Sequence, residues 1–301
     1  MPSSTQKLDT NAVWFVTGCS SGIGKSLATK IYNAGHRIVA TARDVTSLSY
    51  LPDGPTVLKL HLDVTRQETI TKAIADAVDK FHGIDVFINN AGYSLMGDTE
   101  GITDADARHQ IETNFWGPVH VTREALRVFR EVNAPGRGGT VIQISSMGGW
   151  ITVPGHSFYH ASKFALEGFT ESISKEVNPS WNIHFLLVSP GGVRTNFAGS
   201  SLKQSPRHPA YDDPNSSFSQ IIKYVTNPDS QSTWSDPDIC AQVLFEAVVG
   251  QYERPLPMRL LLGAESIPLI KDDIERTLRD IDAWEKETVR CSPNGGAVLD
   301  M

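Results

Sequence analysis

A tyrosine and a lysine on one predicted helix are the residues of this chain best placed for proton chemistry. Tyr159 and Lys163 occur in the run YHASK, and a spacing of four residues puts both side chains on one helical face. An ammonium about 4 Å from a phenol oxygen favours the phenolate by roughly 4 kcal/mol at an effective dielectric of about 20. The sequence therefore predicts that Lys163 lowers the pKa of Tyr159, so that the phenol can act as a general acid or base.

Two serines that end an apolar run are the second candidate for chemistry. Ser145 and Ser146 follow TVIQI, which is typical of a strand. Doubly wound parallel sheets bind ligands at the carboxyl ends of their strands, so a serine hydroxyl there could bind a carbonyl oxygen beside Tyr159. The alternative is a serine that only caps the strand end, which fits Ser145 better than it fits both residues.

A glycine cluster near the amino terminus is typical of a phosphate-binding turn. Gly18, Gly22 and Gly24 lie in TGCSSGIG, between an apolar run and a helix-like stretch. Such a turn directs free backbone N–H groups and the positive end of a helix dipole at one point, and Ser20 and Ser21 add hydroxyl donors. The spacing differs from the G-x-G-x-x-G dinucleotide fingerprint, so the turn could also serve only the close packing of strand and helix.

The elements that must position these groups alternate as they do around a parallel sheet. Most predicted strands are apolar throughout, as strands covered on both faces are. They lie at residues 13–17, 37–42, 56–62, 84–89, 140–145, 183–189 and 258–262. Helices are predicted between them, at residues 22–34, 66–81, 104–131, 157–177, 237–249 and 264–287.

A single domain with loose ends is expected from the length of 301 residues. The domain is predicted over residues 12–287, with a flexible amino terminus at 1–11 and a flexible tail at 288–301. Between residues 198 and 236 the periodicity fails, apart from a short helical piece around 220–225. A connection of this length is usually a lid over a site or partly disordered.

Charge and composition argue against several classes of protein. The net charge of -7 opposes binding to nucleic acid, and no apolar run is long enough to span a bilayer. Because the amino terminus is polar where a signal peptide is apolar, a cytoplasmic protein is expected. No metal site is expected, since Cys19, Cys240 and Cys291 are too far apart and His156 and His160 lack a third ligand.

Five ordered motifs resemble the classical short-chain dehydrogenase/reductase family. They are TGCSSGIG, NNAG at 89–92, SSMGG, YHASK and PGGVRT at 190–195. The resemblance implies a Rossmann-like, doubly wound, seven-stranded parallel sheet with helices on both faces, in a single domain. It also implies a catalytic tetrad, whose matching positions in this chain are Asn114, Ser146, Tyr159 and Lys163.

The resemblance also implies a role for each member of the tetrad. Tyr159 gives its proton to a substrate oxygen as hydride arrives from a nicotinamide, and Ser146 holds that oxygen. Lys163 lowers the pKa of Tyr159 and binds the nicotinamide ribose. Asn114 lies at a kink in its helix and links Lys163 to solvent through a water.

The end of the second strand bears on the choice of cofactor. NAD-preferring relatives carry an acidic residue where Ala42 stands, whereas Arg43 follows here, as in NADP-preferring relatives, and could pair with a 2′-phosphate. Asp44 could instead engage Arg43 in a salt bridge. NADP(H) is the expected cofactor, and the resemblance places these residues around it: Gly18, Ser20, Ser21, Gly22, Ile23, Gly24, Arg43, Asp63, Val64, Asn90, Ala91, Gly92, Tyr159, Lys163, Pro190, Gly191, Val193 and Thr195.

The expected substrate is a hydrophobic ketone or aldehyde, or the corresponding alcohol, with reduction favoured. The residues expected around it are mostly apolar: Tyr93, Ser94, Met147, Trp150 and Val153. The C-terminal sequence resembles a branch of the family that acts on steroid, retinoid, lipid or secondary-metabolite carbonyls. Two other functions stay open, an isomerase, dehydratase or cyclase of secondary metabolism without net redox change, and a non-catalytic nucleotide-sensing protein. The resemblance further implies a homodimer paired through the helices at 104–131 and 157–177.

Overall fold

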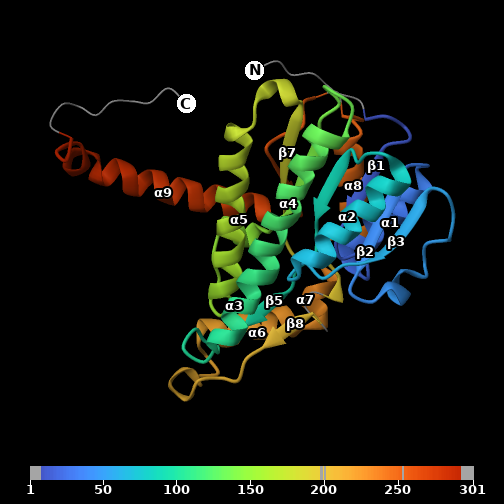
Figure 1. The fold of residues 1–301 in the computed structure, drawn as a ribbon. Helices are drawn as coiled ribbons and strands as arrows, with labels where there is room; N and C mark the ends of the chain where they lie inside the picture. Colours follow the sequence, from blue (N-terminus) through green and yellow to red (C-terminus); the bar gives the residue numbers. More distant parts are fainter. Residues whose placement is uncertain (1–7, 197–198, 200, 253, 293–301) are drawn as a thin grey trace.

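Seven parallel strands form the sheet at the centre of the molecule (Figure 1). The computed structural model describes residues 8–196, 199, 201–252 and 254–292. The strands lie in the order β3-β2-β1-β4-β6-β7-β9, so the order reverses direction between β1 and β4. Their bounds are β1 Val13–Val16, β2 Arg37–Ala42, β3 Val57–His61, β4 Val86–Asn89, β6 Gly139–Ile144, β7 Ile183–Pro190 and β9 Arg259–Leu262. The predicted fold and all its predicted strands are confirmed.

Side chains of the central strand alternate between the two faces of the sheet, so both faces need a cover. Trp14 and Val16 of β1 belong to one hydrophobic core, whereas Val13 and Phe15 belong to the other. The first core is closed by α1 Gly22–Asn33 and α8 Pro237–Val248. The second is closed by α2 Gln67–Phe81, α4 Gly117–Arg127 and α5 Ser157–Glu176. This is the doubly wound arrangement that the sequence predicts.

The long helix predicted at residues 104–131 is interrupted at its centre. The chain forms α3 Asp104–Ile111, a π-helical turn η2 Glu112–Trp116, then α4, and finally a second π-helical turn η3 Val128–Val132. Pro118 contributes to the first interruption because it has no N–H to donate to the carbonyl of Asn114. The kink that the resemblance implies at Asn114 therefore has a local cause, the proline four residues later in the chain.

The segment predicted as an irregular lid has more structure than its composition indicates. It contains β8 Leu202–Gln204, η7 Pro209–Tyr211, α6 Ser217–Thr226 and α7 Pro228–Ser232. The strand β8 pairs in parallel with β5 Ser94–Met96, which the sequence did not predict. Asp98 anchors the segment, since its buried carboxylate accepts hydrogen bonds from Arg207 Nε and His208 N. This pairing depends on contacts across about a hundred residues, which no local pattern records.

The last helix leaves the body of the molecule (Figure 1). It runs over α9 Ser266–Val289, and its first turns pack on β9 through the buried Ile270. The predicted tail at 288–301 therefore begins with two helical residues, while 293–301 and most of the predicted loose amino terminus, 1–7, lie outside the described residues. Among the helices described, none is both long and apolar enough to cross a membrane. The other short helices are η1 Val45–Leu48, η4 Met147–Gly149 and η5 Pro179–Trp181.

Candidate active site

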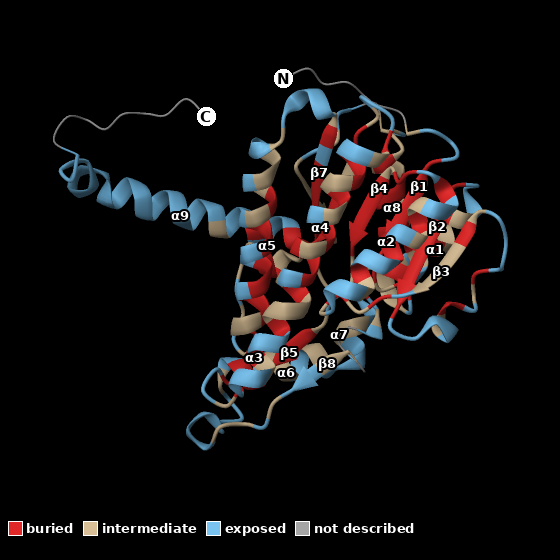
Figure 2. Ribbon diagram, viewed as in Figure 1, coloured by how far each residue is buried: buried red, intermediate tan, exposed pale blue. Residues whose placement is uncertain are grey.

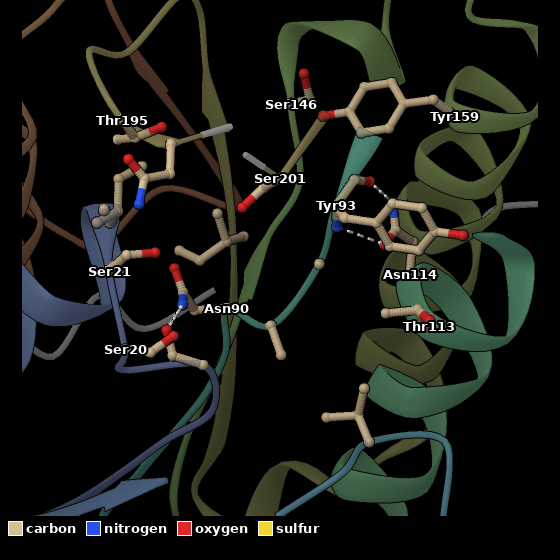
Figure 3. Close-up of a pocket in the computed structure, with 18 of the residues that line it drawn as sticks. Ser20, Ser21, Asn90, Tyr93, Thr113, Asn114, Ser146, Tyr159, Thr195 and Ser201 are labelled. Atoms are coloured by element: carbon tan, nitrogen blue, oxygen red, sulfur yellow. Dashed lines mark hydrogen bonds between the residues drawn. The ribbon is translucent and has the colours of Figure 1, made fainter. Parts of the chain in front are cut away.

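A cavity of about 680 Å³ opens at the carboxyl edge of the sheet, where the chain leaves β1, β2, β4, β6 and β7. All four tetrad positions line it, Asn114, Ser146, Tyr159 and Lys163. Every residue expected around the cofactor lines it too, except Gly24. In Figure 3 the serines of the glycine turn face the cavity from one side and Ser146 and Tyr159 from another. The structure thus brings the nucleotide and tetrad residues together in one place.

The glycine turn is shaped for a ligand and for packing at once. Gly18 and Gly22 have φ values of +72° and +56°, which favour glycine. A Cβ on Gly18 would lie 2.8 Å from Ala91 Cα, and one on Gly24 would lie 2.3 Å from Asn90 Nδ2. The N-terminus of α1 has no side-chain cap from Ser21. Its first N–H groups are therefore available to the diphosphate of a dinucleotide, while the glycines let the turn pack closely against Ala91 and Asn90.

The two asparagines after β4 have different tasks. Asn90 Nδ2 donates hydrogen bonds to the carbonyls of Thr17 (2.8 Å) and Gly18 (3.0 Å), so it holds the glycine turn while lining the cavity. The buried Asn89 instead donates to Thr122 Oγ1 at 3.2 Å and ties β4 to α4. Thr17, whose Oγ1 accepts from the N–H groups of Asn90 and Ala91, is a supporting residue that the sequence reasoning missed.

Arg43 and Asp44 follow β2, and their side chains have different surroundings. The Asp44 carboxylate caps η1, accepting hydrogen bonds from Thr46 N (2.9 Å) and Thr46 Oγ1 (2.7 Å). These bonds lower the pKa of Asp44. In the part of the chain that the structure describes, no ion pair joins Arg43 to Asp44, and the exposed Arg43 lines the cavity. The structure therefore does not show the alternative in which Asp44 forms a salt bridge with Arg43.

Tyr159 lies almost fully buried at the start of α5, with its hydroxyl beside Ser146 (Figure 3). Burial raises the pKa of the phenol to about 12, and a hydrogen bond with Ser146 works in the opposite direction. Ser146 also accepts a hydrogen bond from Gly148 N at 2.9 Å, which fixes it at the start of η4. At neutral pH the phenol is therefore protonated and held by a neighbouring hydroxyl.

Lys163 is buried one helical turn after Tyr159, and its ammonium is hydrogen-bonded to the main chain of β6. Lys163 Nζ donates to the carbonyl of Ile144 at 2.8 Å and lies 5.8 Å from the centre of the Tyr159 ring. Burial lowers the pKa of Lys163 to about 8, and the charge of Glu167 opposes this change. The sequence predicts that Lys163 lowers the pKa of Tyr159. In the structure the pKa of the phenol is instead raised, because the effect of its burial is the larger one.

Asn114 lies in the π-helical turn and is buried. Its side chain is committed to the loop after β4, since Oδ1 accepts from Tyr93 N (3.2 Å) and Nδ2 donates to Tyr93 O (3.0 Å), as Figure 3 shows. The π-bulge releases its main-chain carbonyl from the usual helical hydrogen bond, a feature frequent at functional sites. Because Nδ2 also donates to Ser162 Oγ at 3.4 Å, Asn114 joins the loop after β4 to α5 beside Lys163.

The wall opposite the nucleotide side is more polar than the sequence indicated. Of the residues expected around the substrate, only Tyr93 lines the cavity. Ser94 is fully buried in β5, and Val153 N donates to His160 Nε2 at 2.9 Å. Trp150 is turned toward Ser189 and Arg259, and Met147 is also outside the lining, because η4 directs this stretch away from the cavity. The sequence reasoning missed His109 and Thr113, whereas three further lining residues, Ser201, Leu202 and Lys203, belong to the segment predicted as a lid.

Comparison with known families decides what this geometry belongs to. The family model of the short chain dehydrogenases matches residues 12–206, which hold the glycine turn and the whole tetrad. The chain belongs to the short-chain dehydrogenase/reductase family. Its G-x-x-x-G-x-G spacing is the signature of that family, whose members are typically oxidoreductases that use NAD or NADP. The fit of the cavity to a dinucleotide agrees with such a cofactor.

Relatives extend the match over most of the chain. Oxidoreductase calM of Penicillium decumbens is 43% identical over 281 residues, which cover 92% of this chain and 91% of that protein. An uncharacterized oxidoreductase of Schizosaccharomyces pombe, C162.03, is 36% identical over 85% of this chain and 83% of its own length. The crystal structure of a short-chain dehydrogenase from Streptomyces avermitilis has a TM-score of 0.82 and 31% identity, and covers 95% of this chain and 100% of that one. The similarity to these oxidoreductases therefore extends over most of this chain, beyond the residues that the family model matches.

Proposed function

We propose that the protein is an NADPH-dependent carbonyl reductase, of the alcohol dehydrogenase type, that converts a bulky ketone or aldehyde to its alcohol. The observation that carries the proposal is the protonated, buried Tyr159 beside Ser146 at one end of a cavity lined by a nucleotide-binding turn. A carbonyl needs a proton as it is reduced, and a phenol that is protonated at neutral pH and hydrogen-bonded to Ser146 is in position to donate one.

The side chains divide the reaction between them. Ser146 donates a hydrogen bond to the carbonyl oxygen, and Tyr159 then transfers its proton to that oxygen, so that the C=O bond becomes C–OH. When bound, NADPH supplies the hydride that the carbonyl carbon receives. Lys163, held by the carbonyl of Ile144 one helical turn from Tyr159, would bind the nicotinamide ribose and stabilise the phenolate that the proton transfer leaves.

Arg43 supports NADP(H) over NAD(H). The position before it is the neutral Ala42, and the Asp44 carboxylate is occupied by Thr46. The guanidinium at the mouth of the cavity is therefore available to a 2′-phosphate, which it can bind with two parallel hydrogen bonds.

The substrate is proposed to have an apolar body and a second polar group. Tyr93 OH and Thr113 Oγ1, both in residues of the cavity wall, are buried without a hydrogen-bond partner in the described structure. An unpaired buried hydroxyl is costly, so a substrate that hydrogen-bonds either one gains affinity over an analogue that does not.

The test is NADPH oxidation with a panel of hydrophobic ketones, with and without a second hydroxyl or carbonyl group. We expect turnover with NADPH to exceed turnover with NADH, and Arg43→Ala to raise the KM for NADPH about tenfold or more while that for NADH changes little. Product formation without net NADPH consumption would favour the isomerase, dehydratase or cyclase alternative. Tight nucleotide binding with no product from any substrate would favour a nucleotide sensor.

A homodimer is also proposed. The outer face of α5 exposes Phe164 beside the small residues Ala161, Ala165 and Gly168, and Trp116 of η2 is also exposed. Such a flat face of small and aromatic residues suits close packing of two helices. Sedimentation of the native chain against Phe164→Glu tests this, with a shift to monomer expected.

A further inference from the structure

A line of ionisable groups runs along α5 from the tetrad toward the surface. Tyr159, Lys163, Glu167 and Glu171 follow one another at intervals of four residues, so they share one face of the helix. Arg259, from the last strand of the sheet, reaches between the two glutamates. Its Nε donates to Glu167 at 3.0 Å and its NH2 group donates to Glu171 at 2.7 Å.

Glu167 is the buried member of this line. Its side chain is 8% exposed, whereas that of Glu171 is 40% exposed. Ser189 of β7 donates a hydrogen bond to the second Glu167 oxygen at 3.4 Å. Gly149 makes room for the carboxylate, because a Cβ there would lie 3.0 Å from Glu167 Cγ. The fold has therefore made a dedicated place for a negative charge one helical turn behind Lys163.

Few other charges face Lys163. On its own helix the ionisable neighbours are Tyr159 and Glu167. It donates a hydrogen bond to the carbonyl of Ile144 in β6, and the neutral Asn114 of η2 lines the same cavity. His109 of α3 lines the same cavity. Glu167 thus supplies a buried carboxylate four residues from the buried ammonium of Lys163. Arg259 is the cation that is hydrogen-bonded to the same carboxylate.

We propose that Glu167 is a positioning residue for Lys163, whose buried carboxylate keeps that ammonium protonated, and that Arg259 sets how much of the negative charge reaches it. The inference rests on the proposed function only in that Lys163 must be a cation to bind the cofactor and support turnover. A buried opposite charge one helical turn away favours the charged form of a lysine, and a cation bound to that carboxylate weakens the effect. Removing Glu167 and removing Arg259 should therefore have opposite effects.

The pKa of Lys163, lowered to about 8 even with Glu167 present, puts these effects in a measurable range. Without the carboxylate the pKa falls further, toward neutral pH. Without Arg259 the carboxylate acts on Lys163 alone, and the pKa rises.

The experiment measures NADPH binding by fluorescence, and kcat/KM with a reducible ketone, as functions of pH in the intact enzyme. In Glu167→Gln we expect the loss of affinity at high pH to begin about 1 pH unit lower, so that affinity falls roughly tenfold at a pH where the native enzyme still binds. In Arg259→Met the same limb moves to higher pH, and Arg259→Lys returns it toward the native position. Glu171→Gln is the matched control on the same helix and the same arginine, and its limb should move far less, since that carboxylate is exposed and one turn farther away.

A double variant keeps the test decisive if Glu167→Gln folds poorly with Arg259 left unpaired. Glu167→Gln with Arg259→Met removes both charges, and its limb should match that of Glu167→Gln. A uniform loss at every pH, with the limb unmoved in all variants, would overturn the proposal and leave Glu167 a packing residue. Absence of turnover with every ketone would contradict the proposed function instead, while the binding profile would still report on Lys163.

Discussion

Of the two long helices α5 and α9, the first buries charged side chains and the second exposes large apolar ones. In α5, Lys163 and Glu167 are each 6% exposed, whereas in α9 Trp284 is 66% and Ile281 57% exposed. Figure 2 shows the contrast, with α5 coloured as buried along its inner face and α9 as exposed along most of its length. Burial in this protein therefore follows the position of an element in the fold rather than the polarity of its residues.

The reason lies in the partners that each helix has. The charges of α5 are paired within the chain, Lys163 with the Ile144 carbonyl and Glu167 with Arg259, which offsets the cost of removing them from water. The apolar residues of α9 have no equivalent cover within the described chain once the helix passes Ile270. An exposed apolar side chain costs little, whereas an unpaired buried charge costs much.

The largest expected effect comes from the buried end of α5. Tyr159→Phe removes only the phenolic hydroxyl, which is the proton donor. The value of kcat should therefore fall by about 10²–10⁴-fold while NADPH affinity stays near the native value. Steady-state kinetics and fluorescence titration measure the two quantities. Retained turnover would show that the buried phenol is not the proton donor.

The next largest effect is expected on stability, at the buried leucine of α5, which has an exposed counterpart in α9. Leu166 is 0% exposed, so Leu166→Ala leaves a cavity and should lower the free energy of unfolding by about 2–5 kcal/mol. Chemical denaturation measures the change. A loss below about 1 kcal/mol would mean that α5 is packed more loosely than the structure shows.

A smaller effect is expected in the pH dependence of stability. The pKa of Lys163 falls from 10.5 to about 8 on folding, so the unfolded chain binds more protons between these values, and stability contributed by this group rises with pH across that window. Lys163→Met lacks this contribution, so the difference in melting temperature between native and variant enzyme should change in favour of the native enzyme as pH rises from about 8 to 10. A constant difference over that range would show that Lys163 is not titrating there.

The smallest effect is expected at the matching leucine of α9. Leu278 is 52% exposed, so Leu278→Ala should change the free energy of unfolding by less than about 0.5 kcal/mol. The same denaturation experiment serves as the measurement. If the loss approaches that of Leu166→Ala, then α9 is covered in solution and the contrast between the helices holds only within one chain.

Local patterns accounted for most of the sheet and for the assembly of the site. The motifs after β1, β4, β6 and β7 converge because the carboxyl ends of parallel strands share one edge, and the structure places Gly18, Asn90, Ser146 and Pro190 there. Trp150 and Met147 were misjudged because nearness in the sequence to Ser146 says nothing about the direction in which η4 turns. Lys203 lies in the predicted lid, but the sequence could not single it out, since β8 forms only by pairing with β5, far away in the chain.

By itself, the sequence determined the alternation of elements, the glycine turn, and the spacing of Tyr159 and Lys163. These depend on hydrogen bonding and side-chain periodicity over a few residues, which a local pattern contains. Only the tertiary structure decided that Lys163 binds the Ile144 carbonyl, that Arg259 meets Glu167, and that the phenol of Tyr159 holds its proton more tightly than a free tyrosine. Those outcomes depend on burial and on charges brought together from distant elements, and electrostatic free energies in a protein are set by such surroundings.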